Sequence, residues 1–261
     1  MKTNVLFMLL ILANGCFGAN VYRFGPFVQP EDKISKASDL ALKTNPGRIM
    51  EILKSKDPVK RKYLAKCFGV EEFAKTECWK EEYKKESVIL EKQQQGYDVL
   101  FYRYIADQSG RGTALFLFYK NEGKEQRFVC MLEFQEGGAQ VNNAEGTFEY
   151  KWQSVVDGNE IKELVMTDKF GGHAASEKVL HIFKVFDGDV KEIFTGGLGG
   201  YQQVANFKYE SYEAIVAIEE KGDFPRKIEY SDRDTRSGKV AVWQKSNYIW
   251  DDKSREYIKS K

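Results

Sequence analysis

The chain has 261 residues, with 40 Lys and Arg against 39 Asp and Glu, 42% apolar residues, and 14 Tyr, 18 Phe and 4 Trp. This length accommodates one large domain, or one domain with a smaller companion. The near-zero net charge excludes a strongly basic nucleic-acid-binding protein, and the apolar and aromatic content excludes a chain that is disordered by composition.

Residues 1–18 have the layout of a secretory signal peptide. Lys2 precedes an unbroken apolar run over residues 5–13, and small residues follow. This run is much shorter than the roughly 20 residues that a helix needs to span a bilayer. The sequence therefore predicts export without a permanent transmembrane helix. Cleavage after Gly18 would release a soluble chain, and because Lys2 leaves with the leader, 39 charges of each sign would remain.

A competing cleavage site lies after Gly15. Residues 12–16 read Leu-Ala-Asn-Gly-Cys and resemble a relaxed bacterial lipobox, in which apolar and small residues precede a cysteine that receives lipid. The resemblance implies a bacterial lipoprotein that loses residues 1–15 and is attached to a membrane through lipid on Cys16. It also implies a place in the bacterial cell envelope, at the outer membrane or in the periplasm, with surface exposure as a further option. Both cleavage alternatives stay open.

Three cysteines remain in the folded part. An exported chain meets an oxidising environment, and Cys67 and Cys78, on neighbouring predicted helices, are the candidate disulfide pair, with unpaired buried thiols as the alternative. Cys130 lies in a strand pattern and is expected to be a buried, inert thiol. The chain has no C-x-x-C motif, and its two histidines lie far from the cysteines, so no metal site and no cofactor are predicted.

Residues 31–95 are charged and carry helical spacing. Four helices are predicted here: one with its apolar face at Ile34, Ala37, Leu40 and Ala41, one over Ile49 to Leu53, one that begins after Asp57-Pro58 and stops at Gly69, and one from about Glu71 to Gln94. Asp before Pro is a helix start, and Gly is a helix stop. We therefore expect a helical subdomain over residues 19–96.

From Tyr97 onward the apolar period changes to two, as in strands. Phe148, Tyr150 and Trp152, for example, alternate with polar residues. Short turns such as Asp157-Gly158-Asn159 and Asp187-Gly188-Asp189 separate such runs and are typical of hairpins. Further strands are predicted at 98–105, 113–119, 126–134, 160–167, 178–186, 190–195, 203–209, 212–219, 226–231, 239–244 and near 247–258.

These elements predict an α+β fold, with an N-terminal helical subdomain followed by a large antiparallel β meander over residues 97–261. The meander must close, curl or fold over itself to cover its apolar face. It forms either a sandwich or an open half-barrel capped by the helices. In its number of elements and its compartment, the half-barrel option resembles the lipoprotein-carrier fold of bacterial envelopes.

No motif indicates catalysis. The stretch Thr195 to Gly200 lacks the spacing of a dinucleotide-binding loop and is expected to be a long turn. Ser231 to Gly238 carries two carboxylates at calcium-loop spacing but has a cation at the next ligand position, so a solvated hairpin turn is expected. His173 with Ser176 has no third partner nearby, and His181 is expected to be a residue of a sheet face.

The aromatic residues are the unusual feature of this composition. They form either a thick core between sheet and helices or a partly open apolar groove for an acyl chain or an extended partner. We expect an exported, non-catalytic envelope protein with a binding or structural role. The alternatives are a carrier or chaperone for lipid-like or lipoprotein ligands and, third, an exported hydrolase. The residues assigned to the groove are Phe101, Tyr102, Phe116, Phe118, Trp152, Trp243 and Trp250.

Overall fold

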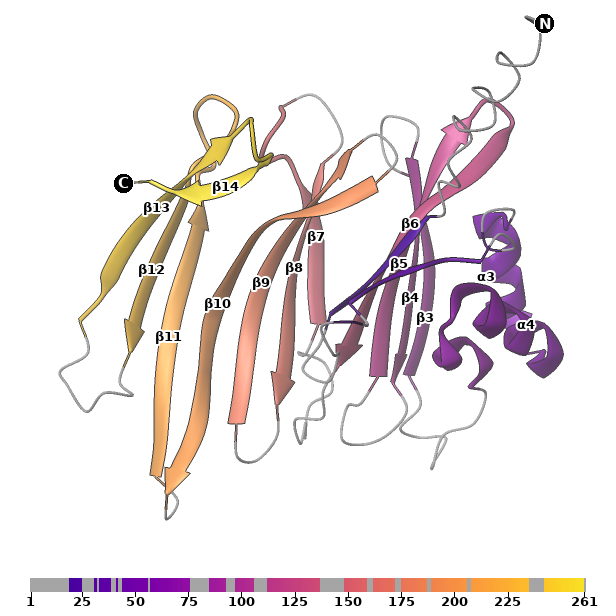
Figure 1. Ribbon diagram of the computed structural model, residues 1–261, viewed down its shortest axis with the longest axis horizontal. Coiled ribbons are helices and arrows are strands. Elements are labelled where there is room, and N and C mark those ends of the chain that lie inside the picture. Colours follow the sequence, from indigo (N-terminus) through magenta and orange to yellow (C-terminus); the bar gives the residue numbers. More distant parts are fainter. Residues whose placement is uncertain are drawn as a thin grey trace, which may run out of the picture.

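The computed structural model describes residues 19–24, 31, 33–38, 41, 44–55, 57–75, 85–92, 97–105, 112–136, 148–158, 162–171, 175–186, 189–205, 208–234 and 242–260. Two β-sheets and two short helices make up most of these residues (Figure 1). The first sheet has six strands in the order β2-β1-β6-β5-β4-β3, and the second has eight in the order β14-β13-β12-β11-β10-β9-β8-β7. The expectation of a β-rich protein built mainly of antiparallel strands is confirmed.

The first sheet takes strands from both sides of residue 97. The strands β4, β5 and β6 form the antiparallel meander that the period of two predicts. The strand β1 pairs with β6 in parallel, with Asn20 opposite Cys130. The chain therefore enters the interior of the sheet at its first described residues. The bounds are β1 (Asn20–Phe24), β2 (Ile34–Lys36), β3 (Lys85–Lys92), β4 (Tyr97–Ile105), β5 (Gly112–Glu122) and β6 (Glu125–Glu136).

The second sheet is an antiparallel meander in which spatial order follows sequence order. Its strands are β7 (Phe148–Gln153), β8 (Glu163–Gly171), β9 (Ala175–Phe186), β10 (Asp189–Ala205), β11 (Lys208–Ile218), β12 (Ile228–Asp234), β13 (Gln244–Asp251) and β14 (Glu256–Lys259). The long turn expected at Thr195 to Gly200 is wrong, because this stretch lies inside β10. Two irregularities in the pairing of β9 with β10, at Glu192/Phe194 and at Gly197/Gly199, accommodate it.

Helix α4 (Pro58–Phe68) begins and ends where the sequence predicts, and α3 (Pro46–Ser55) covers the predicted stretch from Ile49 to Leu53 but begins earlier, at Pro46. In α4, the Asp57 side chain accepts hydrogen bonds from the backbone N–H groups of Val59 and Lys60, and Gly69 caps the other end with a φ of 68°. These are the cap residues that satisfy the free backbone groups of a helix. In α3, the Asn45 side chain accepts from the N–H of Gly47 at 2.9 Å.

The first predicted helix is wrong at its start, although Ala41 is helical, and the fourth is wrong. Ile34–Lys36 is strand β2, and the expected helix from Glu71 to Gln94 is a short 3₁₀-helix at Glu71–Ala74 followed by strand β3. The strand β3 is an edge strand that pairs only with β4. Charged residues suit such an edge, and in the sequence they read as the polar face of a helix. Strands β1, β2 and β3 of the predicted helical region thus share a sheet with β4 to β6.

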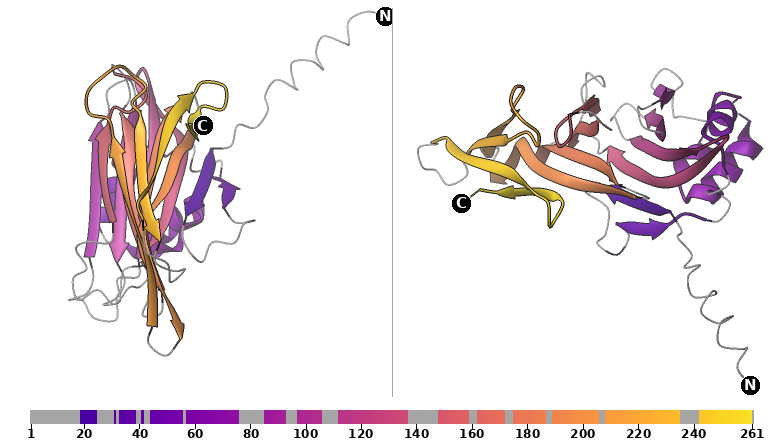
Figure 2. Two further views of the ribbon diagram at one scale, coloured as in Figure 1. Left: turned by 90° about the vertical axis from the view of Figure 1, so that its left-hand side faces the viewer. Right: turned by 90° about the horizontal axis from the view of Figure 1, so that it is seen from above.

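The layers are helices, first sheet and second sheet. One apolar cluster joins α3 and α4 to one face of the first sheet, and another joins the opposite face to β7, β8, β9 and β10. Figure 2 shows the helices and the strands β13 and β14 at opposite ends of the molecule. Glu91 links two sheet edges, since its carboxylate accepts hydrogen bonds from Tyr150 Oη at 2.7 Å and from Trp152 Nε1.

Candidate functional site

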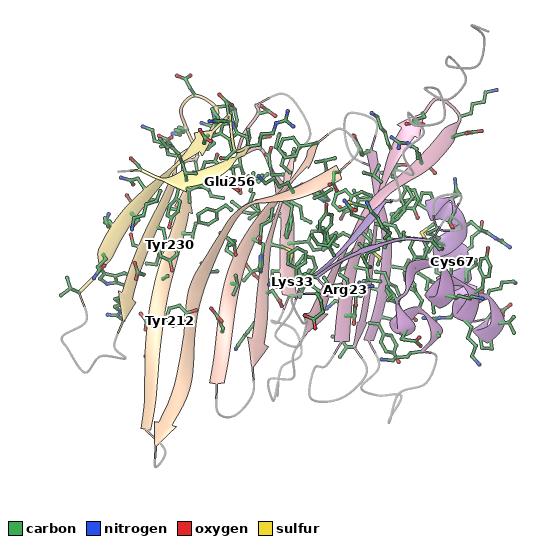
Figure 3. The ribbon with its side chains drawn as sticks, in the orientation of Figure 1. Arg23, Lys33, Cys67, Tyr212, Tyr230 and Glu256 are labelled. Atoms are coloured by element: carbon green, nitrogen blue, oxygen red, sulfur yellow. The ribbon has the colours of Figure 1, made fainter. Side chains whose placement is uncertain are left out.

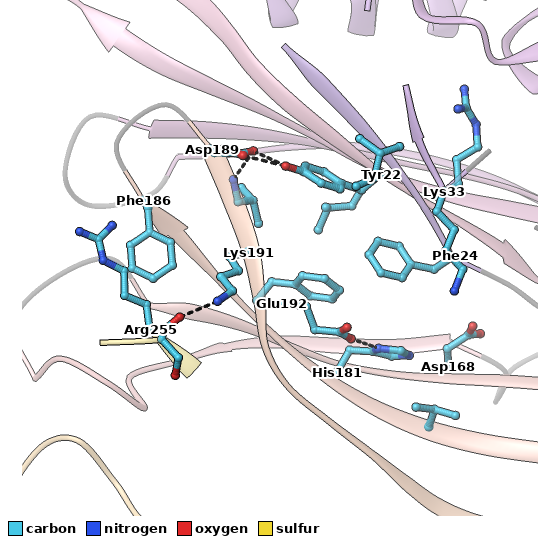
Figure 4. A pocket seen from close by; sticks show the side chains of 17 residues that line it. Tyr22, Phe24, Lys33, Asp168, His181, Phe186, Asp189, Lys191, Glu192 and Arg255 are labelled. Atoms are coloured by element: carbon cyan, nitrogen blue, oxygen red, sulfur yellow. Dashed lines mark hydrogen bonds and ion pairs between the residues drawn. The ribbon is translucent and has the colours of Figure 1, made fainter. Parts of the chain in front are cut away.

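A cleft of about 800 Å³ opens where β1 and β2 meet the second sheet. We call it the junction cleft. Its volume lies within the range of roughly 300–1,000 Å³ that is usual for small-molecule sites. Figure 4 shows side chains from both sheets around it. It is lined by Tyr22, Arg23, Phe24, Lys33, Ile34, Leu132, Asp168, Val179, His181, Phe183, Phe186, Asp189, Val190, Lys191, Glu192, Ser254 and Arg255.

Aromatic rings form part of the apolar wall of the junction cleft. The ring of Phe24 stacks on Phe134 with centroids 4.8 Å apart and meets Phe183 edge to face at 5.3 Å. The imidazole of His181 lies nearly parallel to Phe183 at 5.9 Å. Because Phe183 and Val190 belong to the buried cluster between the two sheets, this wall is continuous with the core and has a fixed shape.

A hydrogen-bonded group closes one side of the cleft. The hydroxyl of Tyr22 donates to the Asp189 carboxylate, with oxygen distances of 2.7 and 2.8 Å, and Asn20 Nδ2 donates to the same carboxylate at 3.2 Å. Burial, followed by the hydrogen bond to Asp189, raises the pKa of Tyr22 above its usual range. The Tyr22 phenol therefore stays protonated and holds β1 to the start of β10.

A histidine and a carboxylate face each other in the same cleft. His181 Nδ1 lies 2.5 Å from Glu192 Oε1, so a general base and a group that orients it are both present. The hydroxyl of Ser254 belongs to the same turn as Arg255, which Figure 4 shows at the opposite side of the cleft from His181. Among the described residues that line the cleft, Ser254 is the one serine, threonine or cysteine, so the lining does not place such a nucleophile next to the base, as a hydrolase of the serine type requires.

The turn between β13 and β14 contributes the other end of the cleft. Arg255 has a φ of 54°, a conformation that costs energy for a residue other than glycine. Its guanidinium lies 5.3 Å from the centroid of the Phe186 ring. Lys191 Nζ donates to the backbone carbonyl of Ser254 at 2.6 Å and lies 3.3 Å from a Glu256 carboxylate oxygen. The turn is therefore fastened to β10.

Two of the four Lys and Arg side chains that line the cleft form ion pairs with a carboxylate. Arg23 pairs with Glu133, and Lys191 pairs with Glu256. Within the part of the chain that the structure describes, Lys33 and Arg255 have no ion pair. The carboxylates of Asp189 and Glu192, in contrast, already accept hydrogen bonds or face a histidine. Asp168 also lines the cleft, and its buried Oδ1 accepts no hydrogen bond. Among the described lining residues, the charged side chains with unused hydrogen-bonding capacity are therefore the donors Lys33 and Arg255 and one acceptor atom of Asp168.

The aromatic residues of the expected groove do not share one surface. Phe101, Phe116 and Phe118 are buried between the two sheets, and Trp152 packs against Phe118 at 6.3 Å. Tyr102 lies on the opposite face of the first sheet, among the residues that contact the helices.

The remaining two tryptophans lie at the far end of the second sheet. Trp250 packs on Tyr257 at 5.6 Å. Trp243 is 40% exposed, with the Arg233 guanidinium 5.1 Å from its ring. None of the seven expected groove residues lines the junction cleft.

Several predicted residues lie outside the described ranges, namely Cys16, Cys78, His173 and the end of the acidic turn after Asp234. Within the described residues, Cys67 and Cys130 are buried and form no disulfide, and burial raises the pKa of both thiols. Figure 3 shows Cys67 on the side of the molecule where the two helices lie. The expectation of a buried thiol at Cys130 is confirmed, whereas the pairing of Cys67 with Cys78 stays a prediction.

Among the described residues, no three metal-ligating side chains gather into a possible metal site. In that same part of the chain, no helix combines the length and the apolar character needed to cross a membrane.

Sequence reasoning missed the junction cleft because its residues come from four distant segments. Tyr22 and Asp189, which share a hydrogen bond, are 167 positions apart. The one local signal was His181 on a strand, flanked by apolar residues. Comparison with protein-family models, curated proteins and solved structures finds no match to this chain.

Proposed function

We propose that this chain is an exported lipoprotein of the bacterial cell envelope that binds a small ligand in the junction cleft and does not catalyse a reaction. The observation that carries the proposal is the cleft itself, with its rigid aromatic wall and its polar rim. Such a combination of apolar walls with a few placed polar groups is typical of small-molecule binding sites.

Attachment to the membrane would place this cleft close to the bilayer. Cys16 precedes Ala19 by three positions, and Ala19 is already buried in the core. Three extended residues span at most about 11 Å. A chain lipidated at Cys16 would therefore be held near the membrane, with β1 and the adjoining cleft at the anchored side.

The lipid anchor is tested by metabolic labelling with a palmitate analogue in a bacterial host. We expect the chain to take up label and to partition into detergent, and a Cys16→Ser variant to lose both properties. A Cys130→Ser variant serves as a control for labelling at other cysteines. If the Cys16→Ser variant keeps the label, the lipoprotein proposal fails and the soluble carrier, released after Gly18, becomes the better account.

Ligand binding is tested separately on a protein that begins at Ala19. Isothermal titration calorimetry with small amphiphiles should show saturable binding with one ligand per chain. The Phe186→Ala variant, which removes an aromatic ring from the cleft wall, should bind every such ligand more weakly. Binding that is absent in the correctly folded protein, or unchanged in Phe186→Ala, would contradict the assignment of the cleft.

A further inference from the structure

We infer that the junction cleft takes a single-chain amphiphile with an anionic head group, with the head at Ser254 and Arg255 and the chain along Phe186, Val190 and Phe183. This inference rests on the proposed function, because it specifies the ligand of the same cleft. It depends on three features of the turn between β13 and β14: an unused donor, an unpaired cation and an adjoining apolar wall.

The first feature is the hydroxyl of Ser254. Its oxygen is buried and has no partner at hydrogen-bond geometry, although the hydroxyl is near enough to the Asp251 carboxylate to lower the pKa of that group. The backbone N–H of Ser254 donates to Asp251, and its carbonyl accepts from Lys191. A buried hydroxyl without a partner costs free energy. A ligand oxygen that accepts a hydrogen bond from Ser254 would remove this cost.

The second feature is the guanidinium of Arg255. Its contact with the ring of Phe186 leaves the N–H groups of the guanidinium edge without a carboxylate partner among the described residues. These groups match the geometry of a carboxylate or another planar anion. The backbone of Arg255 is in the left-handed region, at a φ of 54°, where asparagine or glycine is more usual. Arginine at this position has a backbone cost, which supports a role for its side chain.

The third feature is the apolar wall that begins at the same turn. Phe186 lies beside the Arg255 guanidinium (Figure 4). Val190 and Phe183 also line the cleft, and the Phe183 ring contacts that of Phe24. An aliphatic chain that leaves the head-group site along these residues would be removed from water, which favours binding by about 0.8 kcal/mol for each CH₂ group. A short polar anion such as inorganic phosphate would forgo this contribution.

The sign of the head group follows from the state of the carboxylates. Asp189 is engaged by Tyr22 and Asn20, and Glu192 faces His181. The third carboxylate of the cleft, Asp168, has an Oδ1 that accepts no hydrogen bond, but Figure 4 shows it beside His181 and away from Arg255. At the Arg255 side, an anionic head group therefore meets donors that are free to bind it, and a cationic one meets no carboxylate without a partner among the described residues. The structure thus favours an anionic amphiphile over a cationic or neutral one.

The test compares three ligands with the same ten-carbon chain: decanoate, decanol and decyltrimethylammonium. On the wild-type protein at neutral pH, calorimetry should show decanoate binding about tenfold more tightly than decanol, the usual magnitude for a charge-assisted hydrogen bond. Decyltrimethylammonium should bind more weakly than either. Equal affinity for all three, or preference for the cation, would overturn the inference.

Two variants locate the head group. Arg255→Asn removes the guanidinium while it places a residue that tolerates the left-handed backbone, and it should lower decanoate affinity about tenfold without change for decanol. Lys253→Ala is the matched control, because Lys253 is in the same turn and exposed but does not line the cleft. It should change decanoate affinity by less than about twofold. Equal effects of the two variants would contradict the assigned contact.

Ser254→Ala keeps the inference testable if Arg255→Asn does not fold. This variant should also weaken decanoate and spare decanol. These outcomes distinguish failure of the proposed function from failure of the present inference. Loss of all amphiphile binding refutes the proposed function. Binding that is sensitive to Phe186→Ala but indifferent to the head group and to Ser254 and Arg255 refutes only the present inference. The inference is also refuted if the protein binds decanoate only in the presence of lipid vesicles and not in free solution.

Discussion

At the scale of single residues, the side chain of Arg61 ties the helical layer to the first sheet. It is fully buried, its Nη2 lies 2.5 Å from a Glu86 oxygen, and the same nitrogen donates to Tyr102 Oη at 3.0 Å. Its Nε donates to the backbone carbonyl of Phe73 at 2.8 Å. The guanidinium of Arg61 thus links α4 to the 3₁₀-helix that follows it and to strands β3 and β4.

Replacement of Arg61 by methionine should lower the free energy of unfolding by about 3–5 kcal/mol, because it leaves the mostly buried carboxylate of Glu86 without its cation. Urea unfolding followed by circular dichroism measures this change. Lys62→Ala, one position along the same helix but exposed, should change stability by less than about 0.5 kcal/mol. A loss of under about 1 kcal/mol for Arg61→Met would mean that Glu86 finds another partner.

The sequence predicted single residues well where one local pattern decides their place. Cys130 in an apolar strand run and Asp57 before a proline are found as expected. It did not predict the partners of Tyr22 or the role of Arg255, because a hydrogen bond across 167 positions depends on how two sheets meet. The abundance of aromatic residues also placed Tyr102 and Phe101 in one expected groove, although neighbours in a strand point to opposite faces.

At the scale of elements, the junction of β4 and β5 depends on a glycine. A Cβ atom at Gly112 would lie 2.3 Å from the backbone oxygen of Tyr104, so the strands would have to move apart. We expect Gly112→Ala to lower the free energy of unfolding by about 1–3 kcal/mol, as overpacking does. Denaturant unfolding gives the value.

The control for this prediction is Gly123→Asn in the turn between β5 and β6. Gly123 has a φ of 67°, and a Cβ there would meet nothing within 4 Å. Asparagine tolerates this backbone conformation, so the variant should be close to wild type in stability. If Gly123→Asn destabilised the protein as much as Gly112→Ala, the steric explanation would be wrong.

The elements that sequence analysis missed have a common physical cause. The strands β1 and β2 are short, and β3 is a charged edge strand, so each is stabilised by its neighbours in the sheet more than by its own pattern. The glycines of β10 also depend on neighbouring strands rather than on their own local sequence. A Cβ at Gly196 would lie 3.2 Å from the Tyr230 ring, so these glycines make room for tyrosine rings that the sequence places far away.

At the scale of the whole molecule, buried tyrosine phenols make the free energy of unfolding depend on pH. Burial raises the pKa of Tyr102, Tyr119 and Tyr257 above the usual value. In the unfolded chain these groups ionise near pH 10, whereas in the folded protein they stay protonated. Unfolding therefore releases protons above about pH 10, and the free energy of unfolding should fall as the pH rises further.

The Tyr119→Phe variant isolates one of these phenols. Its hydroxyl is buried without a hydrogen-bond partner, so its removal should leave stability at neutral pH unchanged or slightly higher. Above about pH 10 the variant should lose stability less steeply, by up to about 1.4 kcal/mol per pH unit. Urea unfolding across this pH range measures both slopes. Identical slopes for the two proteins would contradict the role of Tyr119.

The central claim concerns the whole molecule, because the junction cleft exists only where both sheets and the β13–β14 turn meet. Its most direct test is photoaffinity labelling with a photoreactive fatty acid, followed by mass spectrometry of the labelled peptides. The account predicts labels on β9, β10 and the turn that carries Ser254 and Arg255, with competition by unlabelled decanoate. Labels confined to α3 and α4, or spread over the surface without competition, would contradict it.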